Sequence, residues 1–364
     1  MTAATTGAAP RLDETRRDAF AERLRGALNG GALALMVSIG HRTGLFDVMG
    51  RLGFATSEAI ADSAGLHGRY VREWLGAMAA GGVVEVDARS GTYRLPLEHA
   101  ACLTRAARPN NAAATAQWIP LLAGVEDRMV ECFERGGGVP YAAYDRFHEV
   151  MAEESDQTVV AFLVESILPL VPGLPCALGR GVDVLDVGCG SGRALNRMAA
   201  AFPRSRFLGV DLSADAVAAA RAEAADRGHR NVRFEVRDAA DFERERAFDL
   251  VTAFSAIRVQ AEPAAVLAAI ARSLRDGGTF LMQDARGTGH GEDDARHPLG
   301  TFLYTVSCLH WTAASLAAGG AGLGALSGPE AARRLLAEAG FAEVDVHTLE
   351  HDAMNFYYVA RRAG

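Results

Sequence analysis

Residues 182–195 contain the residue types of this chain that are best placed to bind a ligand. An apolar, β-branched run that includes Asp186 leads directly into three glycines and an alanine-rich helical pattern; the glycines are Gly188, Gly190 and Gly192. This order predicts a strand, a tight turn and a helix start, where a ligand can approach the helix N-terminus. Because the spacing is G-x-G-x-G and Asp186 precedes the turn, a cationic or amino-bearing ligand suits it better than a pyrophosphate.

Two further acidic motifs follow the glycine turn. Residues 207–213 form a second apolar run that contains Asp211, and an acid at the end of the second strand can accept both hydroxyls of an adenosine ribose. The third motif is Arg237-Asp238-Ala239. With these three motifs in this order, the sequence resembles the class I S-adenosylmethionine-dependent methyltransferases.

The resemblance implies a role for each donor-site residue. Asp186 and the amides around Gly188, Gly190 and Gly192 would bind the methionine end of S-adenosylmethionine. Asp211 would bind the ribose, Asp238 the adenine amino group, and the Ala239 amide the adenine ring. Leu212 would cover one adenine face, and Phe254 is expected to line the same site. S-adenosylhomocysteine is the expected product.

The loop after the fourth predicted strand departs from the resembled subfamily. Members that carry an N-terminal winged-helix domain tend to have the sequence Asp-Ala-Ile-His-Asp-Gln in this loop. This chain instead has Ser255, Arg258 and Val259 at the first Asp, the His and the second Asp of that sequence. Arginine stays protonated and cannot act as a general base, and serine cannot replace a carboxylate. Either the acceptor is an activated carbon, a nitrogen or a carboxylate that needs no base, or the fold catalyses a cyclisation or elimination in which Arg258 holds an anion. The third interpretation is that these substitutions are neutral, because the loop never took part in catalysis.

Other candidates for the acceptor site lie outside this loop. Catalytic roles are expected for Arg258, Ser255 and His310, and substrate contacts for Tyr144, Phe147, His148 and Trp311. Aromatic residues beside the glycines at 136–138 could form a lid, although ordinary core packing is an equal alternative. A polar loop with His290, Asp293, Asp294 and His297 lacks regular ligand spacing, so no metal site is expected.

Composition narrows the class of protein. The 364 residues carry a net charge of -8, which argues against binding dominated by nucleic-acid phosphates. The sequence contains no lysine, which excludes a lysine Schiff base and a Walker-type phosphate loop. The five cysteines are scattered without a C-x-x-C pair, as expected for reduced thiols in the cytoplasm. Neither a signal peptide nor a membrane-spanning run is expected, and residues 1–10 are predicted to be a disordered tail.

Residues 11–108 are predicted to form a winged-helix and dimerisation domain. Helices are expected at 11–30, ending at Gly30-Gly31, and at 32–39 and 45–52; two more helices and a strand pair complete the pattern. Between residues 56 and 97, four arginines face five acids, so no basic DNA-binding surface is predicted and a DNA-binding regulator is the weaker alternative. The apolar N-terminal helices favour a homodimer.

The remaining chain is predicted to contain two parts. Residues 109–178 read as a helical connector and substrate lid, with one long apolar helix over 159–171. Residues 179–364 alternate strands and helices, which predicts an α/β domain with a parallel sheet. The resemblance implies a seven-stranded Rossmann-like methyltransferase sheet whose last strand is antiparallel. The expected function is methyl transfer from S-adenosylmethionine to a small-molecule, secondary-metabolite acceptor, with no membrane or nucleic-acid partner.

Overall fold

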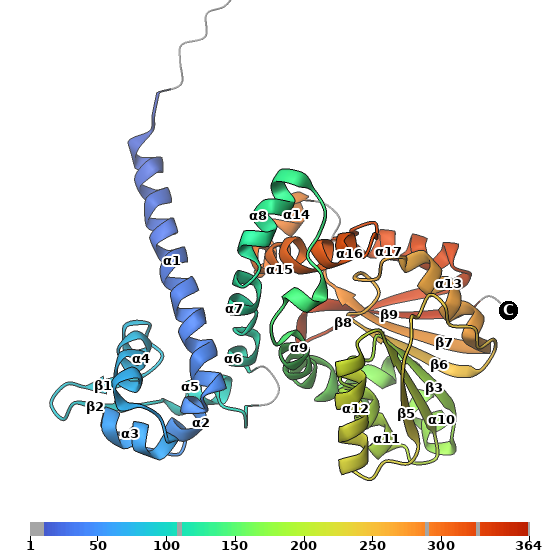
Figure 1. The fold of residues 1–364 in the computed structure, drawn as a ribbon, viewed down its shortest axis with the longest axis horizontal. Coiled ribbons are helices and arrows are strands. Elements are labelled where there is room, and N and C mark those ends of the chain that lie inside the picture. The colour runs from blue at the N-terminus through green and yellow to red at the C-terminus, as the bar shows by residue number, and fades with distance from the viewer. Residues whose placement is uncertain (1–10, 108–110, 288–290, 325–327, 363–364) are drawn as a thin grey trace, which may run out of the picture. The chain divides into compact units, whose positions relative to one another are not determined.

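The computed structural model describes residues 11–107, 111–287, 291–324 and 328–362. The chain divides into two compact units, Met1–Ala106 and Ala107–Gly364 (Figure 1). The predicted tail at residues 1–10 lies outside the described residues, as do residues 108–110 at the predicted boundary. A separate lid over 109–178 stays a prediction.

The first unit begins with one long helix. Helix α1 runs without interruption over Glu14–Arg42, and Asp13 caps it by accepting a hydrogen bond from the Arg16 amide at 3.1 Å. The predicted break at Gly30-Gly31 and the separate helix over 32–39 are therefore wrong. Glycine costs about 1 kcal/mol in a helix interior relative to alanine, and the surrounding alanines and leucines propagate the helix through both positions.

The winged helix is confirmed in the same unit. Its helices are α2 (Leu45–Met49), α3 (Ser57–Ala64), α4 (Gly68–Ala80) and α5 (Leu97–Leu103), and its wing is the antiparallel pair β1 (Glu85–Asp87) and β2 (Thr92–Arg94). Trp74 packs against Phe46 with ring centroids 5.3 Å apart, and its indole N–H donates to the Met36 carbonyl at 2.9 Å. This contact joins the C-terminal half of α1 to α4.

The second unit contains the seven-stranded sheet that was expected. The strand order is β5-β4-β3-β6-β7-β9-β8, and β9 runs antiparallel to both of its neighbours. The strands are β3 (Asp183–Val187), β4 (Arg206–Asp211), β5 (Val232–Val236), β6 (Phe248–Phe254), β7 (Leu274–Ala285), β8 (Phe341–Leu349) and β9 (Asp352–Arg362). The predicted turn at 276–278 is wrong, because these residues lie within β7 where its register against β6 shifts.

Helices cover both faces of the sheet. One core cluster joins β3 and β4 to α10 (Leu174–Arg180), α11 (Arg193–Ala201) and α12 (Ala214–Asp226). The second cluster joins the opposite faces to α13 (Pro263–Ser273) and α17 (Gly328–Glu338). Val184 belongs to the first cluster and Leu185 to the second, since neighbouring side chains in a strand point to opposite faces.

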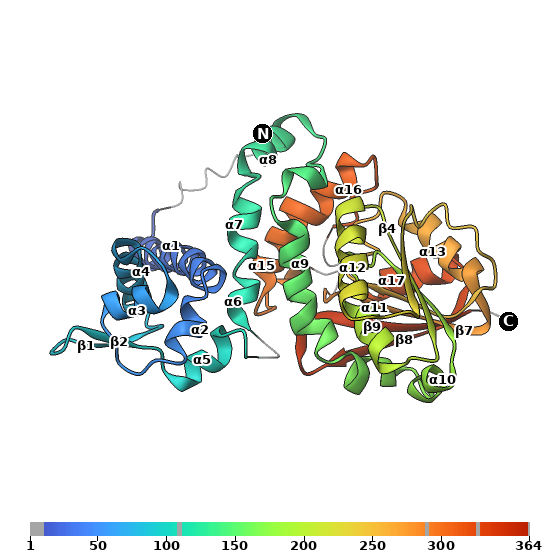
Figure 2. The ribbon, with the colours of Figure 1, turned by 60° about the horizontal axis from the view of Figure 1, so that its bottom comes forward.

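Two helical segments accompany this sheet. The first contains α6 (Ala112–Thr115), α7 (Trp118–Ala123), α8 (Glu126–Arg135), a 3₁₀ turn η1 (Tyr141–Ala143) and α9 (Phe147–Ser155). Helix α9 lies alongside α12 in both views (Figures 1 and 2). The second contains α14 (Gly291–Asp294), α15 (Gly300–Val306), the π-helical turn η5 (Ser307–Thr312) and α16 (Ala313–Ala317).

The predicted long helix over 159–171 is wrong. This stretch is divided among π-helical turns η2 (Asp156–Val160) and η3 (Leu163–Ile167) and a 3₁₀ turn η4 (Leu168–Leu170). Phe162 separates η2 from η3 with φ -113° and ψ 2°, outside the helical region. Its ring stacks on His351 with centroids 3.5 Å apart, a tertiary contact that an apolar pattern does not reveal.

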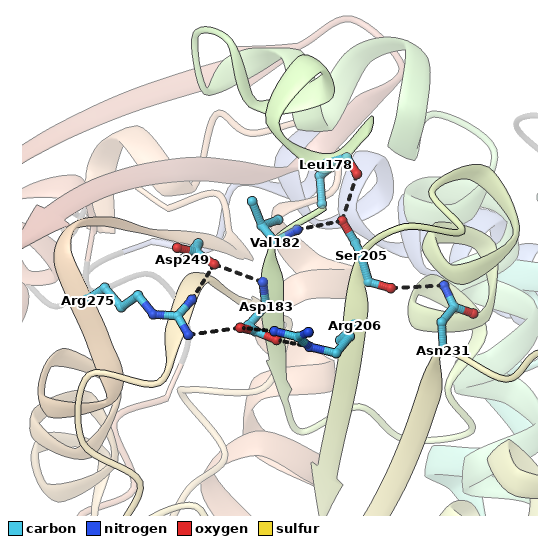
Figure 3. Close-up of polar contacts among 8 residues, drawn as sticks. All are labelled: Leu178, Val182, Asp183, Ser205, Arg206, Asn231, Asp249 and Arg275. Carbon is cyan, nitrogen blue, oxygen red and sulfur yellow. Dashed lines mark hydrogen bonds and ion pairs between the residues drawn. The ribbon is translucent and has the colours of Figure 1, made fainter. Parts of the chain in front are cut away.

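A polar network connects the amino ends of the central strands (Figure 3). Asp183 of β3 accepts hydrogen bonds from Arg206 at 2.6 Å and 2.8 Å and from Arg275 at 2.8 Å. Arg275 also pairs with Asp249 of β6 at 2.5 Å. These contacts lie at the opposite end of β3 from the glycine turn, so they hold the strands together away from the candidate site.

Among the described residues, no single helix is long and apolar enough to span a membrane. One bent pair, Leu163–Leu170 with Leu174–Arg180 at 111°, meets the length and composition requirements only when its two parts are taken together.

Candidate functional site

The glycine turn after β3 has the conformation that its sequence predicts. Gly188, Gly190 and Gly192 have φ values of 69°, 50° and 71°, which favour glycine. A Cβ on Gly188 would lie 2.4 Å from the Ala256 Cβ, and one on Gly192 would lie 2.7 Å from the Ala220 Cβ. No atom lies within 4 Å of a Cβ built on Gly190. The turn is therefore packed at both ends and open in the middle.

Asp211 lies directly beside this opening. One of its carboxylate oxygens accepts a hydrogen bond from the Gly190 amide at 2.8 Å, and the other accepts from the Ser213 amide at 2.8 Å. Each carboxylate oxygen can accept more than one hydrogen bond, so both retain capacity for ligand hydroxyls. The next residue, Leu212, is 62% exposed, and its role in covering the adenine stays a prediction.

Asp186 is the buried acid of the site. Only 3% of the residue is exposed, and its carboxylate accepts a hydrogen bond from Thr252 Oγ1 at 2.6 Å. The pKa of Asp186 is raised to about 7. Burial is the main cause, the Thr252 hydrogen bond opposes it, and the negative charge of Asp211 adds to the rise. A cationic ligand group beside Asp186 would favour its ionised form.

The third motif follows β5 next to Asp211. The Arg237 amide donates to the Asp211 carbonyl at 2.9 Å, and Asp238 Oδ1 accepts from the Ala240 amide at 2.8 Å. Ala239 is buried, and Phe254 is half-buried at the carboxyl end of β6. The predicted donor residues therefore lie at or directly after the carboxyl ends of β3, β4, β5 and β6, around the point where the strand order reverses. Open α/β sheets bind their ligands in this position.

Ser255 begins the loop after β6 in a left-handed conformation, with φ 55°. Its amide donates to the Gln283 carbonyl at 3.0 Å and its hydroxyl donates to Gln283 Oε1 at 3.2 Å. Gln283 Nε2 in turn donates to Asp352 at 2.8 Å. The Ser255 hydroxyl proton is therefore used in a buried network, which sequence reasoning did not predict. Its catalytic role stays a prediction.

Arg258 is buried and already has an ionic partner. It is 6% exposed, and its Nε and Nη2 atoms pair with Asp284 at the end of β7. Its guanidinium carbon lies 4.5 Å from the centre of the Trp311 ring, while Nη1 has no hydrogen-bond partner among the described residues. Sequence reasoning missed Asp284, which is separated from the apolar run Phe280–Met282 by Gln283, whereas Asp211 directly follows its apolar run.

His310 lies in a cluster of aromatic rings. Phe147 stacks on it at a centroid distance of 4.6 Å, and Tyr144, Tyr141 and Trp118 surround it at 5.0, 5.4 and 5.9 Å. Within the part of the chain that is described, neither ring nitrogen has a hydrogen-bond partner. Burial lowers the pKa of His310 to about 3, so the imidazole is neutral near pH 7 and accepts a proton poorly.

The predicted substrate residues do not all lie together. Tyr144 and Phe147 line the His310 cluster, and the Tyr144 hydroxyl donates to the Leu309 carbonyl at 2.6 Å. Trp311 instead stacks on Arg258. His148 lies toward the donor residues, because its Nε2 is 2.9 Å from the Ser213 hydroxyl that caps α12.

Tyr141 packs in the His310 cluster, and sequence reasoning considered it only as one aromatic residue of a possible lid. Desolvation and the negative charge of Asp211 both raise the pKa of the Tyr141 hydroxyl. The signal was its position beside Tyr144, three residues after the glycine-rich stretch.

The polar loop at 290–297 makes side-chain contacts where it is described, and its Asp294 is buried. His290 lies outside the described residues, Asp293 pairs with Arg296 at 3.6 Å, and Asp294 accepts from the Tyr304 hydroxyl at 3.3 Å. The described ranges contain no group of three histidine, cysteine or acidic side chains that could hold a metal ion.

Family comparisons match both parts of the chain. Residues 31–105 match the family described as the Rv2258c-like winged HTH domain, and residues 178–316 match a methyltransferase domain. Nocamycin O-methyltransferase of Saccharothrix syringae is 38% identical over 128 residues, which cover 34% of this chain and 44% of that protein. Trans-aconitate 2-methyltransferase of Methylobacterium nodulans is 34% identical over 106 residues, covering 29% and 39%. The chain thus matches less than half the length of these curated relatives.

Solved structures resemble the whole chain at low sequence identity. Human N-acetylserotonin methyltransferase in complex with SAM gives a TM-score of 0.69 at 18% identity and covers 98% of this chain and 100% of that one. Mitomycin 7-O-methyltransferase gives 0.66 at 15% identity, covering 96% and 100%. These likenesses confirm the fold, including the two-part architecture.

Proposed function

Because the chain joins a winged-helix domain to a class I S-adenosylmethionine-dependent methyltransferase domain, we propose that it transfers a methyl group from S-adenosylmethionine to a small molecule. The observation that carries this proposal is the position of Asp211, whose carboxylate lies 2.8 Å from the amide of the open Gly190 turn. A secondary metabolite is the proposed acceptor class, supported by the matched nocamycin enzyme and by the fold of the mitomycin enzyme.

S-adenosylmethionine supplies an electrophilic methyl group on a sulfonium. Asp186 and the Gly188–Gly192 turn fit its amino-acid end, because the turn is open at Gly190 and the acid is buried beside it. Asp211 fits the ribose and Asp238 with Ala239 the adenine, while Leu212 and Phe254 provide apolar surface. We propose that these residues hold donor and acceptor in line and exclude water, which is most of what this displacement requires of a protein.

Isothermal titration calorimetry with S-adenosylmethionine and S-adenosylhomocysteine tests donor binding. We expect both to bind the wild-type chain and to bind Asp211→Ala at least about tenfold more weakly, since two hydroxyl contacts to a charged group are lost. Asp226→Ala, an exposed acid at the end of α12, is the matched control and is expected to bind normally. Absence of binding to the wild-type chain would refute the proposal. Transfer itself is measured as labelled methyl incorporated into a small-molecule library.

The winged helix is proposed to act in assembly rather than in DNA binding. Three of the four arginines between residues 56 and 97 form ion pairs: Arg69 with Glu73, Arg72 with Glu58 and Arg94 with Glu85. A surface that binds phosphates needs an excess of positive charge, which these pairs remove. A gel-shift assay at low salt is expected to show no complex, and a shift that strengthens as salt falls would contradict this assignment. The alternative of a non-methylating reaction receives no support from the comparisons.

We propose that α1 forms a homodimer interface. Its apolar residues Phe20, Leu24, Leu28, Leu35 and Ile39 recur along one helical face and are 39–74% exposed. Apolar surface of this extent on one helix is typical of an association site. Light scattering after size exclusion is expected to show a dimer for the wild-type chain and a monomer for Leu24→Arg/Leu28→Arg. Glu22→Arg, on another face, should remain dimeric, and a monomeric wild-type chain would refute the interface.

We propose a cytoplasmic location because of the state of the cysteines. All five, including the half-buried Cys132, Cys189 and Cys308, are free thiols. Reduced thiols without a disulfide are characteristic of a reducing compartment.

A further inference from the structure

Arg258 brings a hydrogen-bond donor without a partner to the acceptor end of the site. The guanidinium group uses Nε and Nη2 to bind Asp284, and its carbon lies 4.5 Å from the centre of the Trp311 ring. Its Nη1 has no partner among the described residues, although the side chain is 94% buried. An unpaired buried donor costs free energy, so its retention at a candidate site points to a ligand that supplies the missing acceptor.

The position of Arg258 is tied to the donor turn through its own loop. Ala256, two residues before Arg258, is the residue that a Cβ on Gly188 would strike at 2.4 Å. Asp284, the partner of Arg258, ends the strand next to β6, where Phe254 pairs with Gln283. The Arg258–Asp284 pair therefore lies at the carboxyl ends of β6 and β7, beside the turn proposed to bind the methyl donor.

Among the described residues of this region, four candidate proton acceptors are compromised. The Ser255 hydroxyl donates its proton to Gln283, and Asp284 is bound by Arg258. His310 has two unpartnered ring nitrogens, but burial holds its pKa at about 3, so it would retain a proton poorly. Desolvation raises the pKa of Tyr144, which keeps this hydroxyl protonated. A neutral alcohol or phenol beside Arg258 would therefore find no effective proton acceptor among these four side chains.

We infer that the acceptor is a small carboxylic acid with a flat apolar body, bound as its carboxylate by Arg258 Nη1. The inference rests on the proposed methyltransferase function and specifies its substrate class. A guanidinium N–H is well suited to a carboxylate oxygen, and its pair with Asp284 leaves Nη1 for that contact. The Trp311 ring beside Arg258 supplies aromatic surface for the apolar body, and Trp311 and Phe147 pack against the same apolar cluster.

The reaction then balances without proton transfer. A lone pair of the carboxylate oxygen forms the new bond to the methyl carbon, and the electron pair of the sulfur–methyl bond returns to sulfur. The products are a methyl ester and neutral sulfide in S-adenosylhomocysteine, so one negative and one positive charge are consumed. Loss of opposite charges is favoured in a desolvated site, and an arginine in place of a base is consistent with this reaction.

Ligand binding to the complex with S-adenosylhomocysteine gives the first test. Benzoate and cinnamate are titrated by calorimetry against their matched alcohols, benzyl alcohol and cinnamyl alcohol. We expect the acids to bind at least about tenfold more tightly than the alcohols. Equal binding of acids and alcohols, or no binding of the acids, would overturn the inference.

Variants separate the contact from general effects on folding. Arg258→Gln alone leaves Asp284 buried without its partner, so the double variant Arg258→Gln/Asp284→Asn replaces the ion pair by a neutral pair of similar size. We expect this variant to bind S-adenosylhomocysteine normally and to lose the preference for acids. Arg286→Gln is the control, because Arg286 lies two residues beyond Asp284 and stacks on Phe356 at 5.5 Å. An unchanged preference in the double variant refutes the contact.

The product of methyl transfer gives an independent chemical test. With a library of paired acids and phenols and S-adenosylmethionine labelled on its methyl group, we expect labelled products that release methanol in alkali, as esters do. Alkali-stable products would indicate ethers and overturn the inference. If S-adenosylhomocysteine binds but the acids are not preferred, only this inference fails; if neither donor nor product binds, the proposed function fails.

Discussion

The same substitution at the two ends of β3 is expected to change stability in opposite directions. Asp186 is buried at the carboxyl end, and its pKa is raised to about 7 by burial. Asp183 lies at the amino end, and its pKa is lowered by its hydrogen bond to Arg206 and by Arg275. Asp186→Asn should therefore stabilise the unliganded protein at pH 8, whereas Asp183→Asn should destabilise it.

The change in the free energy of unfolding expected for Asp186→Asn follows from the raised pKa of Asp186. A rise from 3.8 to about 7 corresponds to at most about 4 kcal/mol of unfavourable free energy when the carboxylate is fully ionised. This penalty is absent below the unfolded pKa, grows as the pH rises toward 7 and is complete above it. Asparagine can still accept from Thr252 but adds an unsatisfied amide, which costs about 2 kcal/mol. The net gain at pH 8 is about 2 kcal/mol and should fall toward zero by pH 5.

The change in the free energy of unfolding expected for Asp183→Asn is smaller, because the arginines that bind Asp183 are partly exposed to solvent. The side chains of Arg206 and Arg275 are 79% and 39% exposed, so the loss at pH 8 is about 1 kcal/mol. A lowered pKa stabilises the fold above the unfolded value of about 4, and this contribution is lost as the pH falls through the folded value. Asp183→Asn should therefore converge with the wild-type chain in acid.

Thermal melting between pH 5 and pH 8 measures both effects, with about 2–4 °C expected for each kcal/mol. Calorimetry with S-adenosylmethionine adds a functional readout. If binding needs ionised Asp186, wild-type affinity should fall about tenfold from pH 8 to pH 6, and Asp186→Asn should remove this component of the pH dependence. A melting temperature that moves in the same direction for both variants at pH 8 would refute the assignment of opposite pKa shifts.

Two further variants test packing around the site. Gly192→Ala should lower stability by about 3 kcal/mol, since the left-handed conformation and the 2.7 Å approach to Ala220 and Phe234 both oppose a Cβ. Gly190→Ala should cost only about 1 kcal/mol, because its Cβ meets no atom, yet weaken donor binding by filling the open turn; chemical denaturation with calorimetry separates these results. Tyr144→Phe should cost about 1–2 kcal/mol in the same denaturation assay, because the Leu309 carbonyl loses its 2.6 Å hydrogen bond, and unchanged stability would contradict that contact.

Several errors in the sequence predictions have one physical cause. Apolar composition predicted helix over 159–171, but it cannot show that Phe162 leaves the helix to stack on His351. Gly30-Gly31 predicted a helix end, although a local penalty of about 1 kcal/mol per glycine does not outweigh continuous helical hydrogen bonding through α1. In both cases, contacts or cooperative structure outside the local pattern decided the conformation.

The sequence by itself determined the local structure of the half of the site that is proposed to bind the methyl donor. Strand, glycine turn and acid are encoded within short segments, so Asp186, Gly190 and Asp211 could be assigned before any coordinates, and parallel strands bring their carboxyl ends together. Only the tertiary structure decided the acceptor half. Arg258 is neutralised by Asp284, 26 positions away, and His310 is enclosed by rings from residues 118–147. Such partners come from separate elements, and their charge and protonation depend on burial that no local pattern specifies.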